Sequence, residues 1–257
     1  MATLAPPRPV MGALDRIGTT PALTCAAIVG LTLSGFALDR MVGVNVQHLL
    51  GLCCWVFLIG LLRYATPLER VQTLVVVVVA TFFEVLGSVL WGVYVYRHGN
   101  LPMFVPPGHG MVYLFGLRLT QTGFMRAHHR TMVRIALVSA VGWAVIGLTL
   151  LERTDVGGAF GVAVLSFFLL RGRVPHVYAG VFFFVAFLEL YGVAMGTWAW
   201  KPEIPFTGIP NGNPPSGIAS GYVYFDMAAI ALAPFVLEAV RWLRGLAGRD
   251  QAAGPAR

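Results

Sequence analysis

Charged side chains are scarce in this sequence. Asp, Glu, Lys and Arg make up only 11% of its 257 residues, whereas 57% of the residues are hydrophobic. A water-soluble domain could not bury that much apolar surface in its core. The composition therefore excludes an ordinary soluble domain and predicts an integral membrane protein.

Cysteine is also scarce, and the common cofactor motifs are missing. The three cysteines, Cys25, Cys53 and Cys54, lie in apolar stretches, where they predict packing side chains and neither a disulfide nor a metal motif. There is no HExxH, Walker or GxGxxG pattern, and no histidine spacing that would bind two irons. We therefore expect no metal and no cofactor, which argues against metal-dependent hydrolases, desaturases and nucleotide-driven pumps.

Long apolar stretches dominate what is present. Crossing a hydrocarbon layer of roughly 30 Å takes about 20 apolar residues in a helix. Eight stretches predict an all-α polytopic membrane bundle that forms a single transmembrane domain, although the fourth contains Pro106 and Pro107 and the sixth is short. The predicted spans are Ala22–Leu38, Val44–Leu62, Gln72–Tyr94, Met103–Leu119, Met132–Leu151, Val156–Leu170, Val177–Trp198 and Gly217–Val240.

The basic residues are distributed unevenly between the loops. With eight spans, 14 of the 18 basic residues fall in the two termini and the even-numbered connections, and only Arg40, Arg97, Arg153 and Lys201 fall on the other side. This bias is typical of the positive-inside rule and predicts a cell-membrane protein with both termini cytoplasmic. The formal charge of +7 is therefore an orientation signal and does not indicate a nucleic-acid partner.

Two segments of the chain resemble each other. "FFEVLGSVLWGVYVY", from Phe82, and "FLELYGVAMGTWAW", from Phe187, each place an acid before glycines and an aromatic pair, with a one-residue offset that a small helix irregularity would absorb. Each segment then enters a proline-containing loop, "PPGHGMVY" or "PPSGIASGYVY", which aligns Tyr113 with Tyr222 or Tyr224. We expect two parallel halves, 22–119 and 132–240, between cytoplasmic tails 1–20 and 241–257.

Glu84 and Glu189 are the acids of these two segments, and both are predicted to lie deep in the membrane. Glu84 is 14 residues after Arg70 and 13 before Arg97, which places it about 20 Å from either boundary. A carboxylate at such depth costs at least ~2.5 kcal/mol, so it normally has a partner or a task. One interpretation is a pair of protonated acids that hydrogen-bond between helices. The other is acid–base chemistry, because a carboxyl group in apolar surroundings keeps its proton and can donate it to an alkene.

Further candidate residues surround these acids in the sequence. Asp226 has no basic neighbour close in sequence, and His109 follows the double proline, so both are candidates to orient or position a reactant, although such a histidine is also typical of a hydrogen-bonding residue in a turn. A metal held jointly by Glu84, His109, Glu189 and Asp226 stays open. The candidate substrate-binding residues are aromatic, although the Tyr and Trp pairs also fit an interfacial belt. They are Tyr94, Tyr96, Tyr113, Trp198, Trp200 and Tyr222.

The pattern E-x-x-G-x-x-x-x-G-x-Y-x-Y, the proline-bearing loop, and G-x-W-x-W followed by "GIPNGN" resemble the integral-membrane carotenoid-biosynthesis proteins that include bacterioruberin-type hydratases, and more loosely the membrane lycopene cyclases. The similarity covers Phe82–Tyr113 and Phe187–Asp226, and "FVPPGHG" and "NGNPPSG" depart from the usual loops. It implies a helical enzyme, of lyase type, that hydrates or cyclises the end of a carotenoid or other isoprenoid without a metal.

Two functions from different classes remain. The first is a membrane enzyme acting on a lipid or isoprenoid, with Glu84 and Glu189 as the acid–base pair and His109 and Asp226 as positioning groups. The second is a non-catalytic transporter or complex subunit in which the two acids relay protons or a cation. The sequence leaves open whether the chain forms a homo-oligomer or joins a partner in the membrane.

Overall fold

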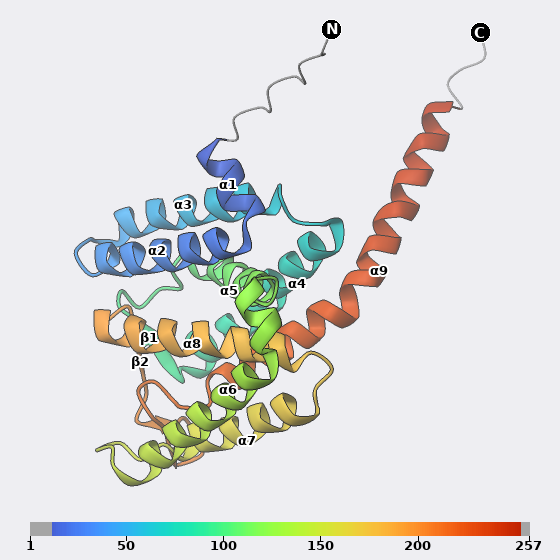
Figure 1. Cartoon of the computed structure of the whole chain (residues 1–257). Helices are drawn as coiled ribbons and strands as arrows, with labels where there is room; N and C mark the ends of the chain where they lie inside the picture. The colour runs from blue at the N-terminus through green and yellow to red at the C-terminus, as the bar shows by residue number, and fades with distance from the viewer. Residues whose placement is uncertain (1–11, 253–257) are drawn as a thin grey trace, which may run out of the picture.

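The computed structural model of the chain describes residues 12–252, and helices dominate it (Figure 1). Four short strands form two antiparallel pairs, β1 (Tyr94–Tyr96) with β2 (Trp198–Trp200) and β3 (Glu203–Ile204) with β4 (Ile209–Pro210). The helices are α1 (Ala13–Thr19), α2 (Pro21–Asp39), α3 (Val44–Leu62), α4 (Pro67–Glu84), the π-helix η1 (Val85–Trp91), α5 (Val105–Thr120), α6 (Gly123–Thr149), α7 (Val156–Arg171), α8 (Pro175–Met195) and α9 (Ala219–Ala252).

Six helical segments among the described residues are long and apolar enough to cross a membrane. They are α2, α3, α4 continued by η1, α6, α8 and the part of α9 up to residue 243. Helices α5 and α7 coincide with the fourth and sixth predicted spans, but each has 16 residues, fewer than the about 20 that span a bilayer unaided. The prediction of an all-helical, multi-pass membrane protein is confirmed.

Both predicted tails contain helix. Helix α1 lies within the predicted tail 1–20, and α9 continues as a helix to Ala252, well beyond Val240, where we expected the last span to end. Residues 241–252 contain no proline and are rich in Ala, Leu and Arg, which favour helix, so nothing stops α9 at the end of its apolar part. The remaining predicted tail residues, 1–11 and 253–257, lie outside the described residues.

The helix that carries Glu84 changes its winding immediately after that residue. Helix α4 passes into the π-helix η1, which ends at Gly92 with φ 73°. A single-turn π-bulge accommodates one additional residue in a helix. This confirms the expected irregularity, because ten positions separate Glu84 from Tyr94 whereas nine separate Glu189 from Trp198. Helix α8 also ends at a left-handed glycine, Gly196, with φ 72°.

Two helix pairs join the first part of the chain to the second. Helix α4 packs along α9, and α5 packs along α8. Small residues allow both approaches. A Cβ atom added to Gly116 of α5 would lie 2.5 Å from Cγ2 of Val181 on α8, and Ala229 of α9 is fully buried in a cluster with Val76 of α4. In this way α4 and α8, which carry the two acids, are each held against a helix from the other half of the chain.

The connections fall at two ends of the bundle. In Figure 1 the α2–α3 and α6–α7 connections lie at the left of the view, with the β1–β2 pair, and the α3–α4 and α7–α8 connections lie at the right. The right-hand connections carry Arg63 and Arg173, and the left-hand ones carry Arg40 and Arg153. Both ends of the bundle therefore carry basic residues in their connections.

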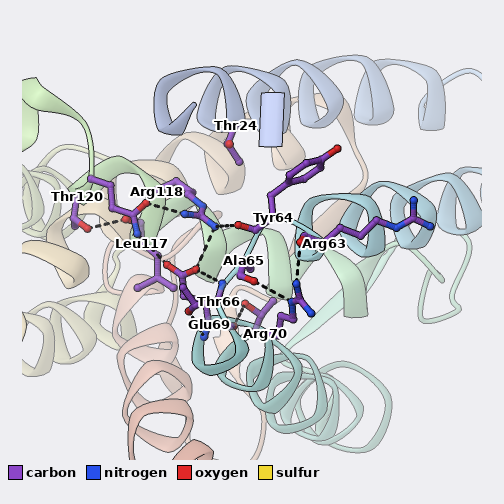
Figure 2. Close-up of polar contacts among 12 residues, drawn as sticks. Thr24, Arg63, Tyr64, Ala65, Thr66, Glu69, Arg70, Leu117, Arg118 and Thr120 are labelled. Carbon is purple, nitrogen blue, oxygen red and sulfur yellow. Dashed lines mark hydrogen bonds and ion pairs between the residues drawn. The ribbon is translucent and has the colours of Figure 1, made fainter. Parts of the chain in front are cut away.

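A polar network holds the end where α3 leads into α4 (Figure 2). Arg118 of α5 donates to Glu69 over 3.3 Å and to the side chain of Gln121 over 2.8 Å, and Gln121 donates to the other Glu69 oxygen over 3.0 Å. Glu69 also forms a capping box with Thr66 at the start of α4. Nearby, the Tyr64 hydroxyl donates to Asp15 over 2.6 Å, which attaches α1 and lowers the pKa of the Asp15 carboxyl.

We predict that Arg118→Met lowers the thermal midpoint of the purified protein in detergent, because Glu69 loses its cation while remaining largely buried. Removing one partner of a fully buried pair costs ~3–5 kcal/mol, and we expect about 2 kcal/mol here because both side chains keep some exposure. Arg63→Met is the matched control, since the Arg63 side chain is exposed at the same end. Equal midpoints for the two variants would contradict a structural role for the network.

Candidate functional site

Glu84 is held by three side chains. The hydroxyl groups of Tyr94 and Tyr96 donate to its Oε2 atom over 2.6 and 2.7 Å, and His109 Nε2 lies 2.9 Å from its Oε1 atom. The tyrosines come from β1, directly after the π-helix, and His109 comes from the first turns of α5. The chain reverses direction after Gly92, and this brings the tyrosines of β1 back to Glu84 of α4.

Glu189 is held in a corresponding way by the second aromatic pair. The indole N–H groups of Trp198 and Trp200 donate to its Oε2 atom over 2.9 and 3.1 Å. Among the described residues no hydrogen bond reaches its Oε1 atom, although the residue is only 5% exposed. Each acid therefore binds the aromatic pair that follows it in its own segment, and the two acids differ in what binds the other oxygen.

A two-stranded ribbon joins the two aromatic pairs. Strands β1 and β2 pair antiparallel, with Tyr94 opposite Trp200 and Tyr96 opposite Trp198. The rings of Tyr94 and Trp200 lie 4.5 Å apart between centroids, and those of Tyr96 and Trp198 lie 6.1 Å apart. The sequence predicted neither strand. The ribbon brings the donors of both acids together, so that the two carboxyl groups face one space.

That space is a cavity of about 180 Å³. Among the described residues no Lys or Arg lines it, so His109 is the only potentially cationic side chain that they contribute. Apart from these polar groups its walls are mainly apolar and come from α2, α3, α4, α5, α8 and α9. The predicted site residues that line it are Glu84, Glu189, His109, Tyr94, Tyr96, Trp198, Trp200 and Tyr222.

Tyr222 and His109 occupy related positions on the cavity wall. Each follows a glycine near the start of its helix, Gly108 in α5 and Gly221 in α9, and the two rings lie 5.4 Å apart. A Cβ atom added at either glycine would meet no atom within 4 Å. The cavity thus exists partly because these positions carry no side chain. Tyr222 therefore matches His109 in its place on the wall, whereas the sequence comparison had aligned Tyr113 with Tyr222 or Tyr224.

Two predicted site residues, Tyr113 and Asp226, do not line the cavity. Tyr113 is 1% exposed and packs against Val76 and Ala229 in the contact between α4 and α9. Asp226 is also 1% exposed, and its Oδ2 atom has no hydrogen-bond partner among the described residues. The helical phase of α5 and α9 turns these side chains away from the space that holds Glu84 and Glu189.

The described residues contain no group of three or more His, Cys, Asp or Glu side chains that could hold a metal ion. Glu84 and His109 lie within hydrogen-bond distance of each other, and the Glu189 carboxyl group is bound by indoles instead. The four-residue metal site that the sequence left open therefore does not assemble in this part of the chain.

Asp155 is a structural residue of the site that sequence reasoning missed. It is 1% exposed and accepts hydrogen bonds from the backbone N–H groups of Gly158, Gly212 and Ser216 over 3.0, 2.8 and 2.7 Å. In the same loop, Asn213 accepts from the backbone N–H of Trp200 over 2.9 Å. Asp155 therefore fixes the "NGNPPSG" loop that holds β2. An aspartate before an apolar helix is a recognisable N-cap signal, but it does not reveal the distant loop.

Comparison of the chain with protein-family models, with curated proteins and with solved structures finds no match. The chemical interpretation of the site therefore rests on the geometry described above.

We predict that Asp155→Ala destabilises the protein by about 3 kcal/mol, because three buried N–H groups lose their acceptor and one such loss costs ~1–3 kcal/mol. The thermal midpoint should fall, and the near-ultraviolet circular dichroism of the tryptophans should weaken as β2 loosens. Asp155→Asn keeps one acceptor oxygen and should have a smaller effect. If Asp155→Ala has the midpoint and spectrum of the unmodified protein, the loop is held in another way.

Proposed function

We propose that this chain is an integral membrane enzyme that performs metal-independent acid–base chemistry, of the hydration or cyclisation type, on an isoprenoid or related lipid within the bilayer. One observation carries the proposal: two carboxyl groups with different hydrogen-bond partners line a single, otherwise mainly apolar cavity. An apolar cavity suits a hydrocarbon, and acids suit the protonation of a carbon–carbon double bond.

The proposal includes eight membrane crossings in two parallel halves, with α5 and α7 as the short spans. The matching positions of Glu84 and Glu189, and of His109 and Tyr222, support two related halves. So do the α4–α9 and α5–α8 pairs, in which each half contributes the corresponding helix. Halves with an even number of crossings share one orientation, which places the acids on either side of an axis along the membrane normal.

Glu189 is the proposed general acid. Both indoles bind its Oε2 atom, so Oε1 is free to carry a proton toward the cavity. Glu84 is the proposed base, because two phenols and an imidazole bind it and an ionised carboxylate is the form that accepts at both oxygens. Dividing the two roles between carboxyl groups in different surroundings is a general strategy of acid–base enzymes.

The chemistry balances without a cofactor. The Glu189 proton adds to one alkene carbon, and the other carbon becomes a cation that the faces of the Trp and Tyr rings stabilise. In hydration, water adds to the cation and loses a proton to Glu84, with His109 sharing it. In cyclisation, a second double bond attacks the cation and the product loses a carbon-bound proton to Glu84. Return of that proton to Glu189 restores the site, so no proton is consumed overall.

Substitution of each acid by glutamine tests this assignment. Gln keeps the size and hydrogen-bonding ability of Glu but cannot transfer a proton. We predict that Glu84→Gln and Glu189→Gln each fold normally, with unchanged elution profile and thermal midpoint, but turn over an acyclic isoprenoid ~10²–10⁴-fold more slowly. Glu238→Gln, at an exposed position of α9, is the control and should retain full activity. A folded and fully active double variant would exclude the mechanism and favour a packing role for both acids.

Proton flux in liposomes, measured on the same variants, addresses the alternative of a proton or cation carrier. A carrier would show flux through the unmodified protein that both Gln variants abolish, with no turnover of an isoprenoid. An enzyme of the proposed kind would show turnover without flux.

The proposed orientation places both termini in the cytoplasm, with Arg126 and Arg171 on that side and Asn100 and Asn211 on the opposite side. Because Asn211 is buried, its loop is best labelled at Phe206, which is 96% exposed. We predict that a membrane-impermeant reagent added outside cells modifies a single cysteine at position 206 but not one at 126 or 171. Modification of positions 206 and 126 from the same side would refute the eight-span arrangement.

A further inference from the structure

The cavity is polar at one end and apolar at the other. The polar end consists of the two acids, His109, Tyr222 and the aromatic pairs of β1 and β2. At the other end, the walls contributed by α2 and α3 carry no charged residue. The one hydroxyl group there belongs to Thr32 and donates to the carbonyl oxygen of Ile28 over 2.9 Å, so its own helix satisfies it. A ligand that lies against α2 and α3 therefore meets an apolar surface.

The apolar end also reaches the outside of the bundle. Cys53 of α3 and Gly35 of α2 both line the cavity. Cys53 is exposed, and Gly35 is half-buried. A Cβ atom added at Gly35 would meet no atom within 4 Å. Helices α2 and α3 lie side by side at one flank of the molecule (Figure 1). In a bilayer this flank faces lipid, so the cavity lining includes residues at the lipid-facing surface of these helices.

The size of the cavity limits what it can hold. Pockets that enclose a drug-sized ligand measure roughly 300–1,000 Å³, whereas this cavity measures about 180 Å³. A long lipid therefore fits only in part, and the remainder has to lie outside, where the surroundings are equally apolar.

We propose that the ligand is one end of a long, apolar, unsaturated chain, which slides in from the lipid between α2 and α3, past Gly35 and Cys53, until its terminal double bond meets Glu189 and Glu84. The identity of the ligand rests on the proposed function, whereas the route of access does not. The lining is also exposed at Phe83 on α4, whose ring centroid lies 5.7 Å from that of Phe225, and entry at that place is the rival route that the test has to distinguish.

The test measures occupancy and not turnover. The full-length protein in lipid nanodiscs is photolabelled with a long acyclic polyene that carries a diazirine a few carbons from the reacting double bond, on the part of the chain that would cross the opening between α2 and α3. The labelled positions are mapped by mass spectrometry, and unlabelled polyene is added in competition. We expect saturable labelling of α2 and α3 around Gly35 and Cys53, in the unmodified protein and equally in Glu84→Gln and Glu189→Gln.

Matched substitutions sharpen the test. Gly35→Leu places a side chain in the opening and should abolish the saturable labelling. Gly30→Leu is its control, because Gly30 lies on the same helix, has open space around it and does not line the cavity. If Gly35→Leu fails to fold, Cys53→Trp serves instead, with Val56→Trp as the control at an exposed position of α3 that does not line the cavity.

Saturable labelling around Phe83 and α9, absence of saturable labelling, or full labelling of Gly35→Leu would each overturn the proposed route. Saturable labelling between α2 and α3 without turnover of any polyene would support the route and refute the enzymatic function. The two proposals can therefore fail separately.

Discussion

Two carboxyl groups at membrane depth need hydrogen-bond donors that lipid cannot supply, and this requirement shapes the centre of the protein. Each acid obtains its donors from an aromatic pair a few residues further along its own chain segment. The aromatic pair can reach back to its acid only if the helix that carries the acid ends between them. In both segments this helix ends at a glycine in the left-handed conformation. The two returning strands then satisfy each other's backbone by pairing. The ribbon is thus a consequence of burying the acids.

The two acid-bearing segments are alike in construction but differ in their hydrogen-bond donors. Phenols bind Glu84 and indoles bind Glu189, and the imidazole of His109 reaches only Glu84. Two carboxyl groups with identical hydrogen-bond donors in one cavity would hold a proton equally well. Different donors make one group the better acid and the other the better base. These differences between the two segments therefore allow one carboxyl group to act as the acid and the other as the base.

Much of the fold could be predicted from the sequence, because hydropathy alone locates helices in a membrane protein. Comparing the two segments gave the extra residue that η1 accommodates. The strands could not be predicted, because three-residue pairings carry no periodicity. Asp155 was missed because two of its donors lie 57 and 61 residues away. Tyr113 was misplaced because the phase of α5 is set by packing against α4, which no local pattern records.

The π-helix also limits which sequence changes the two acid-bearing segments tolerate. A segment of α8 transplanted into α4 would bring Glu, Gly and the aromatic pair, but it would be one residue short between acid and strand. One residue turns a helix by about 100°, enough to direct a side chain to a different face. A direct exchange of these two segments would therefore displace the aromatic pair from its acid, even though both segments bury their acid in the same way.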